Sequence, residues 1–194
     1  MFLPDEPATI FEGEAELALV ISKRAQNVSA ANAMDHIFGY MNFIDGSARG
    51  LASQGFFAMK SRATFAPIGP FLVTKDEVPD PQNLPVKLWV NGVCKQDFNT
   101  NDMAHLIPRC IEWASSVHTL EPGDILATGT NHRGLSSFMD GDVVELEVQG
   151  LGRLKFNVRD DLKRTWSRET RQDRKEKGQD GPTPQLTGKY APGA

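Results

Sequence analysis

The chain has 194 residues, which is enough for one well-buried domain and short for two. Its formal net charge is −4 and its Lys and Arg residues are spread along the sequence, so nucleic acid is not expected as a main partner. Hydrophobic residues make up 40% and charged residues 24%, shares that exclude disorder over most of the length.

Two further features indicate the compartment. Cys94 and Cys110 are too few for a disulfide framework, and neither has a second ligand at zinc-finger spacing. The first residues lack the basic start and apolar run of a signal peptide, and no run of eighteen apolar residues occurs. We therefore expect a soluble cytoplasmic protein without a membrane partner.

The N-terminal part predicts strands joined by short connections. Residues 14–21 alternate and then become apolar, which favours a strand entering the core, with a helix as the alternative. Ser29 is a suitable N-cap for a short helix that Gly39 would end. A second strand is expected over residues 40–45, with Asp45 at its end.

The middle of the chain mixes loop, strand and helix signals. Small residues over 46–61 predict a loop, and residues 66–74 predict a buried strand. Asn91-Gly92 has alternating apolar residues on both sides, which is the strongest short hairpin signal. Residues 101–117 have helical apolar spacing, and Pro108 means that this helix either begins near the proline or bends there.

The last third predicts more strands and then a tail. Residues 120–130 predict a turn feeding a buried strand, and residues 138–158 predict two strands with glycine turns. Many short strands with few helices indicate an α+β domain that is predominantly β. We expect a folded core over residues 1–158 and a charged, turn-rich tail over residues 159–194 that wraps the surface or an oligomer partner.

Alternating acids mark the first strand. On a strand Glu12, Glu14 and Glu16 point to one face, about 6.5 Å apart. Two such carboxylates repel by roughly 2 to 3 kcal/mol at an effective dielectric constant near 20. Solvent could screen them on an edge strand, but the apolar residues after Glu16 draw the strand into the core. A divalent cation would offset the repulsion there, because magnesium, manganese and calcium prefer carboxylate oxygens.

Four fragments in order, EAELALVISK, FIDGSAR, MKSRATFAPIGP and LEPGDILATGT, resemble the fumarylacetoacetate hydrolase family up to about Val158. The resemblance implies a mixed β-sheet roll with few helices, and a homodimer. It also implies that Glu14, Glu16 and Asp45 hold the metal, with Mg²⁺ expected and Mn²⁺ or Ca²⁺ also compatible. Glu12 precedes the motif and receives no role.

The resemblance assigns further residues to the substrate. Lys60 would project into the site and stabilise negative charge on an oxo-acid substrate, both as a binding and as a catalytic residue. Gly129 and Thr130 would contact the substrate through a backbone N–H and a hydroxyl. Arg49 either pairs with an acid or reaches the substrate. No base can be assigned among the four histidines of the chain, which are His36, His105, His118 and His132.

The chain also departs from the family pattern. Gly50 and Ala52 stand where members commonly carry Asp and Gln, which removes possible substrate contacts. Members usually have an N-terminal portion with a water-activating His or His-Glu pair, whereas Met1 begins just before the metal strand. A metal site without such a base would bind better than it turns over.

The resemblance implies a metal-dependent hydrolase that cleaves a carbon–carbon bond in a 1,3-dicarbonyl acid, of the acylpyruvate or diketo-acid type, in small-molecule catabolism. One alternative is an isomerase or decarboxylase of oxo acids on the same metal site. Another is a truncated core that binds metal and a small oxo acid with little turnover. A purely structural module with solvated acids is a further interpretation, and it predicts no stabilisation by divalent ions.

Overall fold

Two sheets form the body of the protein in the computed structural model, which describes residues 1–51, 55–179, 181 and 183–193. Within these residues one four-stranded sheet has the order β3-β2-β1-β6, a second has the order β5-β4-β7-β8, and β10 pairs with β9. The strands are β1 Ile10–Ile21, β2 Ile37–Arg49, β3 Ile68–Thr74, β4 Pro85–Val90, β5 Val93–Asn99, β6 Ile125–Ala127, β7 Val143–Val148, β8 Arg153–Asn157, β9 Thr165–Trp166 and β10 Gln185–Thr187.

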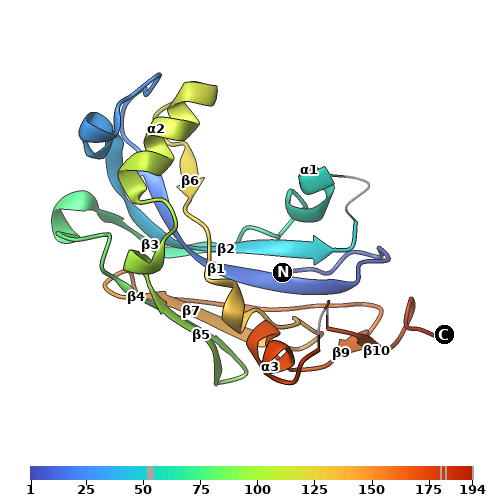
Figure 1. Ribbon diagram of the computed structural model, residues 1–194. Coiled ribbons are helices and arrows are strands. Elements are labelled where there is room, and N and C mark those ends of the chain that lie inside the picture. Colours follow the sequence, from blue (N-terminus) through green and yellow to red (C-terminus); the bar gives the residue numbers. More distant parts are fainter. Residues whose placement is uncertain (52–54, 180, 182, 194) are drawn as a thin grey trace.

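The two large sheets lie as neighbouring layers, with β1 and β2 above β4, β5 and β7 in the view of Figure 1. One hydrophobic cluster joins them and includes Ile44 of β2, Leu88 of β4 and Leu146 of β7. All pairings between the named strands are antiparallel. The expected fold class, predominantly β with few helices, is confirmed.

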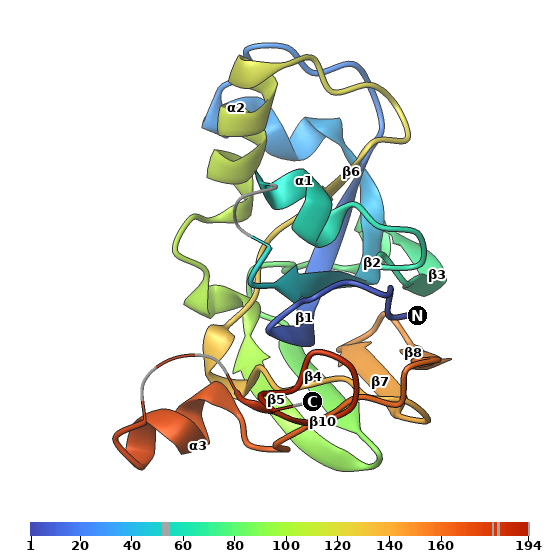
Figure 2. The same ribbon diagram turned by 90° about the vertical axis from the view of Figure 1, so that its right-hand side faces the viewer.

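Short helices cover the ends of the sheets. They are α1 Gly55–Lys60, α2 Ile107–Val117 and α3 Arg171–Glu176, with 3₁₀ segments η1 Ala30–His36, η3 Lys75–Glu77, η4 Thr100–Asp102 and η5 His132–Gly134. Figure 2 shows α2 beside the η1 turn, at one end of the long strands. Of the helices formed by the described residues, none has the length and apolar character that a membrane crossing needs.

The strongest local signals are confirmed. The hairpin of β4 and β5 turns at Asn91 and Gly92, both with positive φ. The helix α2 begins at Ile107 and has Pro108 in its first turn, so the proline starts the helix and does not bend it. The missing N–H of a proline leaves no hydrogen bond unmade at that place.

Several local expectations are wrong. The strand β2 pairs with β1 from Ile37 to Arg49, so Gly39 lies inside a strand and Asp45 does not end one. The supposed loop over 46–61 contains the end of β2 and the helix α1, while Ala52 lies outside the described residues. The strands β3 and β6 are the two edges of their sheet and not buried strands, because β3 pairs only with β2 and β6 only with β1.

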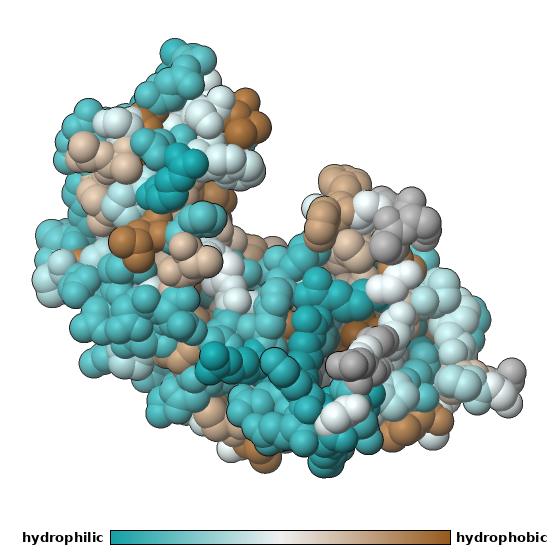
Figure 3. Space-filling model, in the orientation of Figure 1, coloured by the Kyte–Doolittle hydropathy of each residue, from teal (hydrophilic) through white to brown (hydrophobic). Residues whose placement is uncertain are grey.

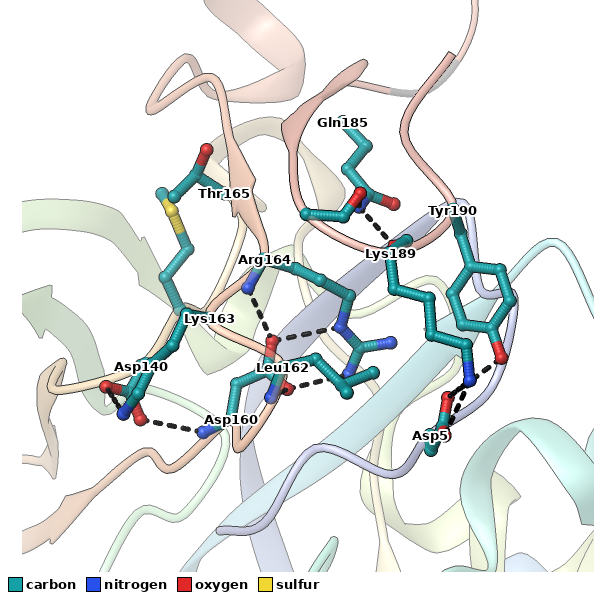
Figure 4. A network of polar contacts seen from close by, with 12 residues as sticks. Asp5, Asp140, Asp160, Leu162, Lys163, Arg164, Thr165, Gln185, Lys189 and Tyr190 are labelled. Carbon is teal, nitrogen blue, oxygen red and sulfur yellow. Dashed lines mark hydrogen bonds and ion pairs between the residues drawn. The ribbon is translucent and has the colours of Figure 1, made fainter. Parts of the chain in front are cut away.

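The C-terminal residues pack onto the start of the chain (Figure 4). Arg164 is fully buried, and its guanidinium donates to the carboxylate of Asp160 at 2.9 and 3.0 Å. It also donates to the carbonyl oxygens of Pro4 and Glu6, and it lies 4.7 Å from the ring centre of Phe11. This one side chain therefore ties the segment after residue 159 to the entry of β1.

Candidate metal centre

Three acids meet where β1 and β2 run side by side. Glu14 lies directly opposite Asp45 in the antiparallel register, and Glu16 follows on the same face of β1 because side chains alternate along a strand. Carboxylate oxygens of Glu14, Glu16 and Asp45 lie within 4.8 Å of one another. The structure therefore brings together the three residues that the sequence singled out as metal ligands.

Glu16 is the most isolated of the three carboxylates. It is 3% exposed and makes no ion pair with any described residue. Burial raises the pKa of its carboxyl to about 8, and the nearby Asp45 and Glu14 charges add to this effect. One backbone N–H opposes the shift, because Gly129 donates to Oε2 of Glu16 at 2.6 Å.

The other two carboxylates share the ammonium group of Lys60. Its Nζ contacts Glu14 and lies 2.5 Å from Oδ2 of Asp45. Burial alone would raise the pKa of Glu14, but Lys60 and Arg49 outweigh burial and lower that pKa. For Asp45 burial dominates and raises the pKa, with the charge of Glu14 adding to it. Lys60 therefore lies within the acidic cluster, as the sequence predicts.

Glu12 anchors two arginines beside the cluster. Its buried carboxylate accepts from Nε of Arg49 at 3.0 Å and from Nη2 of Arg171 at 2.6 Å. Arg49 also donates to Glu14, so a continuous chain of ion pairs joins α3 to the acidic cluster. No role was predicted for Glu12, and its partner Arg171 is 159 residues away along the chain.

The donor set fits a hard divalent cation. It offers only carboxylate oxygens, the ligands that Mg²⁺, Mn²⁺ and Ca²⁺ prefer. Glu16 carries no neutralising partner of its own among the described residues, so a cation at this point would offset the repulsion between the buried acids. Glu14, Glu16 and Asp45 are the residues that would hold it.

The loop after β6 forms one wall of the site. Gly129 has a φ of +88°, which favours glycine, and its N–H is taken by Glu16. The hydroxyl of Thr130 accepts from Nε2 of Gln96 at 2.9 Å. Both residues line a cleft of about 500 Å³, together with His132. The two residues predicted as substrate contacts thus lie next to the acidic cluster.

His132 is a residue that the sequence could not place. Its Nε2 lies 3.5 Å from Oε1 of Glu14, and its side chain is 64% exposed. His36 and His118 instead contact backbone carbonyl oxygens away from the cluster. The only signal in the sequence was that His132 follows Thr130 by two residues, in a loop already assigned to the substrate pocket.

Two glycines let the metal strands lie close to their neighbours. Gly13 pairs with Gly46 across β1 and β2, and each precedes or follows a proposed ligand. A Cβ atom on Gly13 would overlap the ring of Phe138, and one on Gly46 would lie 2.7 Å from the carbonyl oxygen of Phe65. The face opposite the acids is therefore closely packed, which fixes the strands that carry the acids.

Figure 3 shows a deep notch between the part that carries α2 and the part that carries α1. Its floor is hydrophilic, whereas the α1 side has hydrophobic residues at its top. The sheets thus carry a cluster of three carboxylates with a lysine among them, a donor set of the kind that a hard divalent cation prefers.

The chain belongs to the fumarylacetoacetate hydrolase family. Residues 3–159 match the family model described as fumarylacetoacetate (FAA) hydrolase C-terminal. The resemblance drawn from the four sequence fragments is thus confirmed. The match ends just before the segment that Arg164 ties to the N-terminus.

Relatives with different activities share this region. An uncharacterised protein of Pyrococcus abyssi is 44% identical over 151 residues, which cover 75% of this chain and 66% of that protein. The 4-hydroxyphenylacetate degradation bifunctional isomerase/decarboxylase of Salmonella dublin is 43% identical over 144 residues, covering 73% of this chain and 33% of that protein.

A solved structure adds a hydrolase. Maleylpyruvate hydrolase from a Sphingobium species, in complex with manganese (II) ion and pyruvate, has a TM-score of 0.76 and 38% identity, covering 82% of this chain and 58% of that one. The chain spans between 33% and 66% of the length of the two curated relatives described above.

Proposed function

We propose that Glu14, Glu16 and Asp45 hold a divalent cation, and that this centre hydrolyses a carbon–carbon bond in a 1,3-dicarbonyl acid. The supporting observation is the meeting of the three carboxylates within 4.8 Å. The Sphingobium relative, whose structure holds manganese and pyruvate, supports a small oxo acid as the ligand. Mg²⁺ is the proposed ion, with Mn²⁺ or Ca²⁺ as hard-cation alternatives. An acylpyruvate or diketo acid of small-molecule catabolism is the proposed substrate.

The bound cation would act as a Lewis acid toward the 2-oxo acid end of the substrate. Lys60 would neutralise the negative charge that develops on the enolate oxygen when the carbon–carbon bond breaks. The Thr130 hydroxyl would contact the substrate, and the Gly129 N–H would orient the Glu16 carboxylate that it already contacts.

His132 is the proposed base, because it lies beside Glu14 at the open side of the site. It would take a proton from the attacking water, whose oxygen bonds to the distal carbonyl carbon. The electron pair of the broken carbon–carbon bond passes to the enolate, and the proton held by His132 then returns to the enolate carbon. Water is the only co-reactant in this balance.

The same residues could serve isomerisation or decarboxylation of oxo acids, since an enolate also forms in those reactions. The Salmonella relative, named as an isomerase/decarboxylase, favours this second candidate. The hydrolase differs from the isomerase or decarboxylase because only hydrolysis requires water to reach a carbonyl carbon next to the bond that breaks.

We also propose that the protein acts as a cytoplasmic homodimer. Exposed apolar side chains support a protein contact, since Phe56 and Phe57 of α1 are 74% and 79% exposed and Trp113 of α2 is 61% exposed. Light scattering coupled to size-exclusion chromatography would test this proposal, and a monomer at micromolar concentration would contradict it.

A turnover assay beside an oxalate titration tests the proposed function. The protein is incubated with an acylpyruvate and Mg²⁺ or Mn²⁺, and both acid products are quantified. Asp45→Asn should abolish turnover, whereas the matched control Asp97→Asn, on the exposed part of β5, should retain it. Oxalate binding without turnover of any oxo acid would favour the metal- and oxo-acid-binding core. Absence of both oxalate binding and turnover in the wild-type protein would refute the metal centre.

A further inference from the structure

A second cleft lies between the start of β1, the end of β2 and α3, and α3 itself follows the region that matches the family model. It has a volume of about 410 Å³. Four cationic side chains line it, from Arg49 of β2 and from Arg171, Arg174 and Lys175 of α3. Glu12 is the acidic residue of the lining. The cleft is therefore strongly cationic.

The four cations differ in how far neighbouring acids neutralise them. Arg49 and Arg171 both bind Glu12, so their charges are partly neutralised. Arg174 is 12% exposed, and its ionic contact in the described chain is with Glu169 at 3.6 Å. Lys175 forms no ion pair with a described residue.

The guanidinium of Arg174 also has an unsatisfied donor within the described part of the chain. Its Nε is buried and has no acceptor among the residues that the structure describes. A buried charged donor without an acceptor is unfavourable, and a carboxylate is the group that best satisfies a guanidinium. A cationic cleft also concentrates anions near its walls. An anionic oxygen bound in the cleft would supply an acceptor for Nε of Arg174.

The cleft and the metal centre are neighbours, because one side chain contacts both. Arg49 lines the cleft, and the same guanidinium contacts Glu12 with Nε and Glu14 with Nη2. Glu12 and Glu14 are two residues apart on β1, a spacing of about 6.5 Å along a strand. Arg49 therefore lies against both the α3 cleft and Glu14 of the acidic cluster.

We propose that Arg174 and Lys175 form an anion subsite for the second carboxylate of an oxo acid whose first end lies at the metal centre. This inference rests on the proposed function for the first end. It assigns the choice between dicarboxylic and monocarboxylic substrates to α3, a helix outside the matched region 3–159.

Calorimetric titration in Mn²⁺ tests the subsite with two ligands of equal chain length. 2-Oxoadipate carries the second carboxylate and 2-oxohexanoate lacks it. The wild-type protein should bind 2-oxoadipate roughly tenfold more tightly, the scale of one charge-assisted hydrogen bond. Arg174→Gln and Lys175→Gln should each reduce this ratio several-fold and leave oxalate binding unchanged.

Lys155→Gln is the matched control, because Lys155 is an exposed lysine of β8 that pairs with Glu145 and does not line the cleft. It should retain the wild-type ratio. If Arg174→Gln fails to fold by circular dichroism, the exposed Lys175 variant carries the test. A wild-type protein that binds oxalate but shows no preference, or variants that keep the preference, would overturn the subsite alone. Failure of the wild-type protein to bind oxalate would overturn the metal centre and the subsite together.

Discussion

Binding of a divalent cation should expel a proton from Glu16. Burial raises the pKa of this carboxyl to about 8, so at lower pH the metal-free protein holds Glu16 as a neutral acid. The cation requires the carboxylate, and the proton must therefore leave. At pH 6, two units below that pKa, deprotonation of Glu16 costs about 3 kcal/mol. The metal affinity at pH 6 should therefore be roughly a hundredfold weaker than above pH 8.

Titration of Mn²⁺ at pH 6, 7 and 8 measures this dependence, and two buffers of different ionisation enthalpy give the number of protons released. Affinity should rise about tenfold per pH unit over this range. Glu16→Gln should bind the ion more weakly and lose most of the slope. A wild-type affinity that stays constant between pH 6 and 8 would refute the role of Glu16 as a protonated buried ligand.

The carboxyl of Glu16 also affects the stability of the metal-free protein. The pKa of Glu16 is higher in the folded than in the unfolded chain, so the folded protein binds more protons between about pH 4.5 and 8. The contribution of Glu16 to stability is therefore complete below pH 4.5 and is lost as the pH rises through 8. Added Mn²⁺ should reverse this loss, because it stabilises the charged form.

Three substitutions give further expectations. Asp45→Ala should abolish the rise in melting temperature with Mg²⁺ while the metal-free protein stays folded, and an unchanged metal affinity would remove Asp45 from the site. Lys60→Ala should preserve metal binding and weaken oxalate binding roughly tenfold, and equal oxalate affinities would contradict its role. Arg164→Met leaves the buried Asp160 carboxylate unpaired, so urea unfolding should show a loss of about 3 to 5 kcal/mol. A loss of unfolding free energy below about 1 kcal/mol would contradict the stabilising role of the Arg164–Asp160 ion pair.

Local signals in the sequence predicted the elements that depend on few residues. The Asn91-Gly92 turn needs only two residues with positive φ, and the start of α2 needs only the proline at its first turn. The acidic strand was also accessible, because alternation alone places Glu14 and Glu16 on one face.

Features that depend on distant partners were not predictable. The length of β2 is set by its pairing with β1, which overrides the helix-ending and loop-forming signals of Gly39 and the residues after Asp45. The contact of Glu12 with Arg171 joins residues 159 positions apart, and charge patterns along the sequence do not reveal such a pair. His132 likewise meets Glu14 only through the course of the chain.

The paired glycines at positions 13 and 46 bear on any attempt to redesign this centre. Because a methyl group at either position would overlap its neighbours, saturation mutagenesis should recover almost no substitutions there. Engineered preference for softer metals must therefore come from exchanging the acids themselves, on a backbone whose spacing is fixed from the opposite side. The hidden face of the sheet, and not its reactive face, sets the limits of such a design.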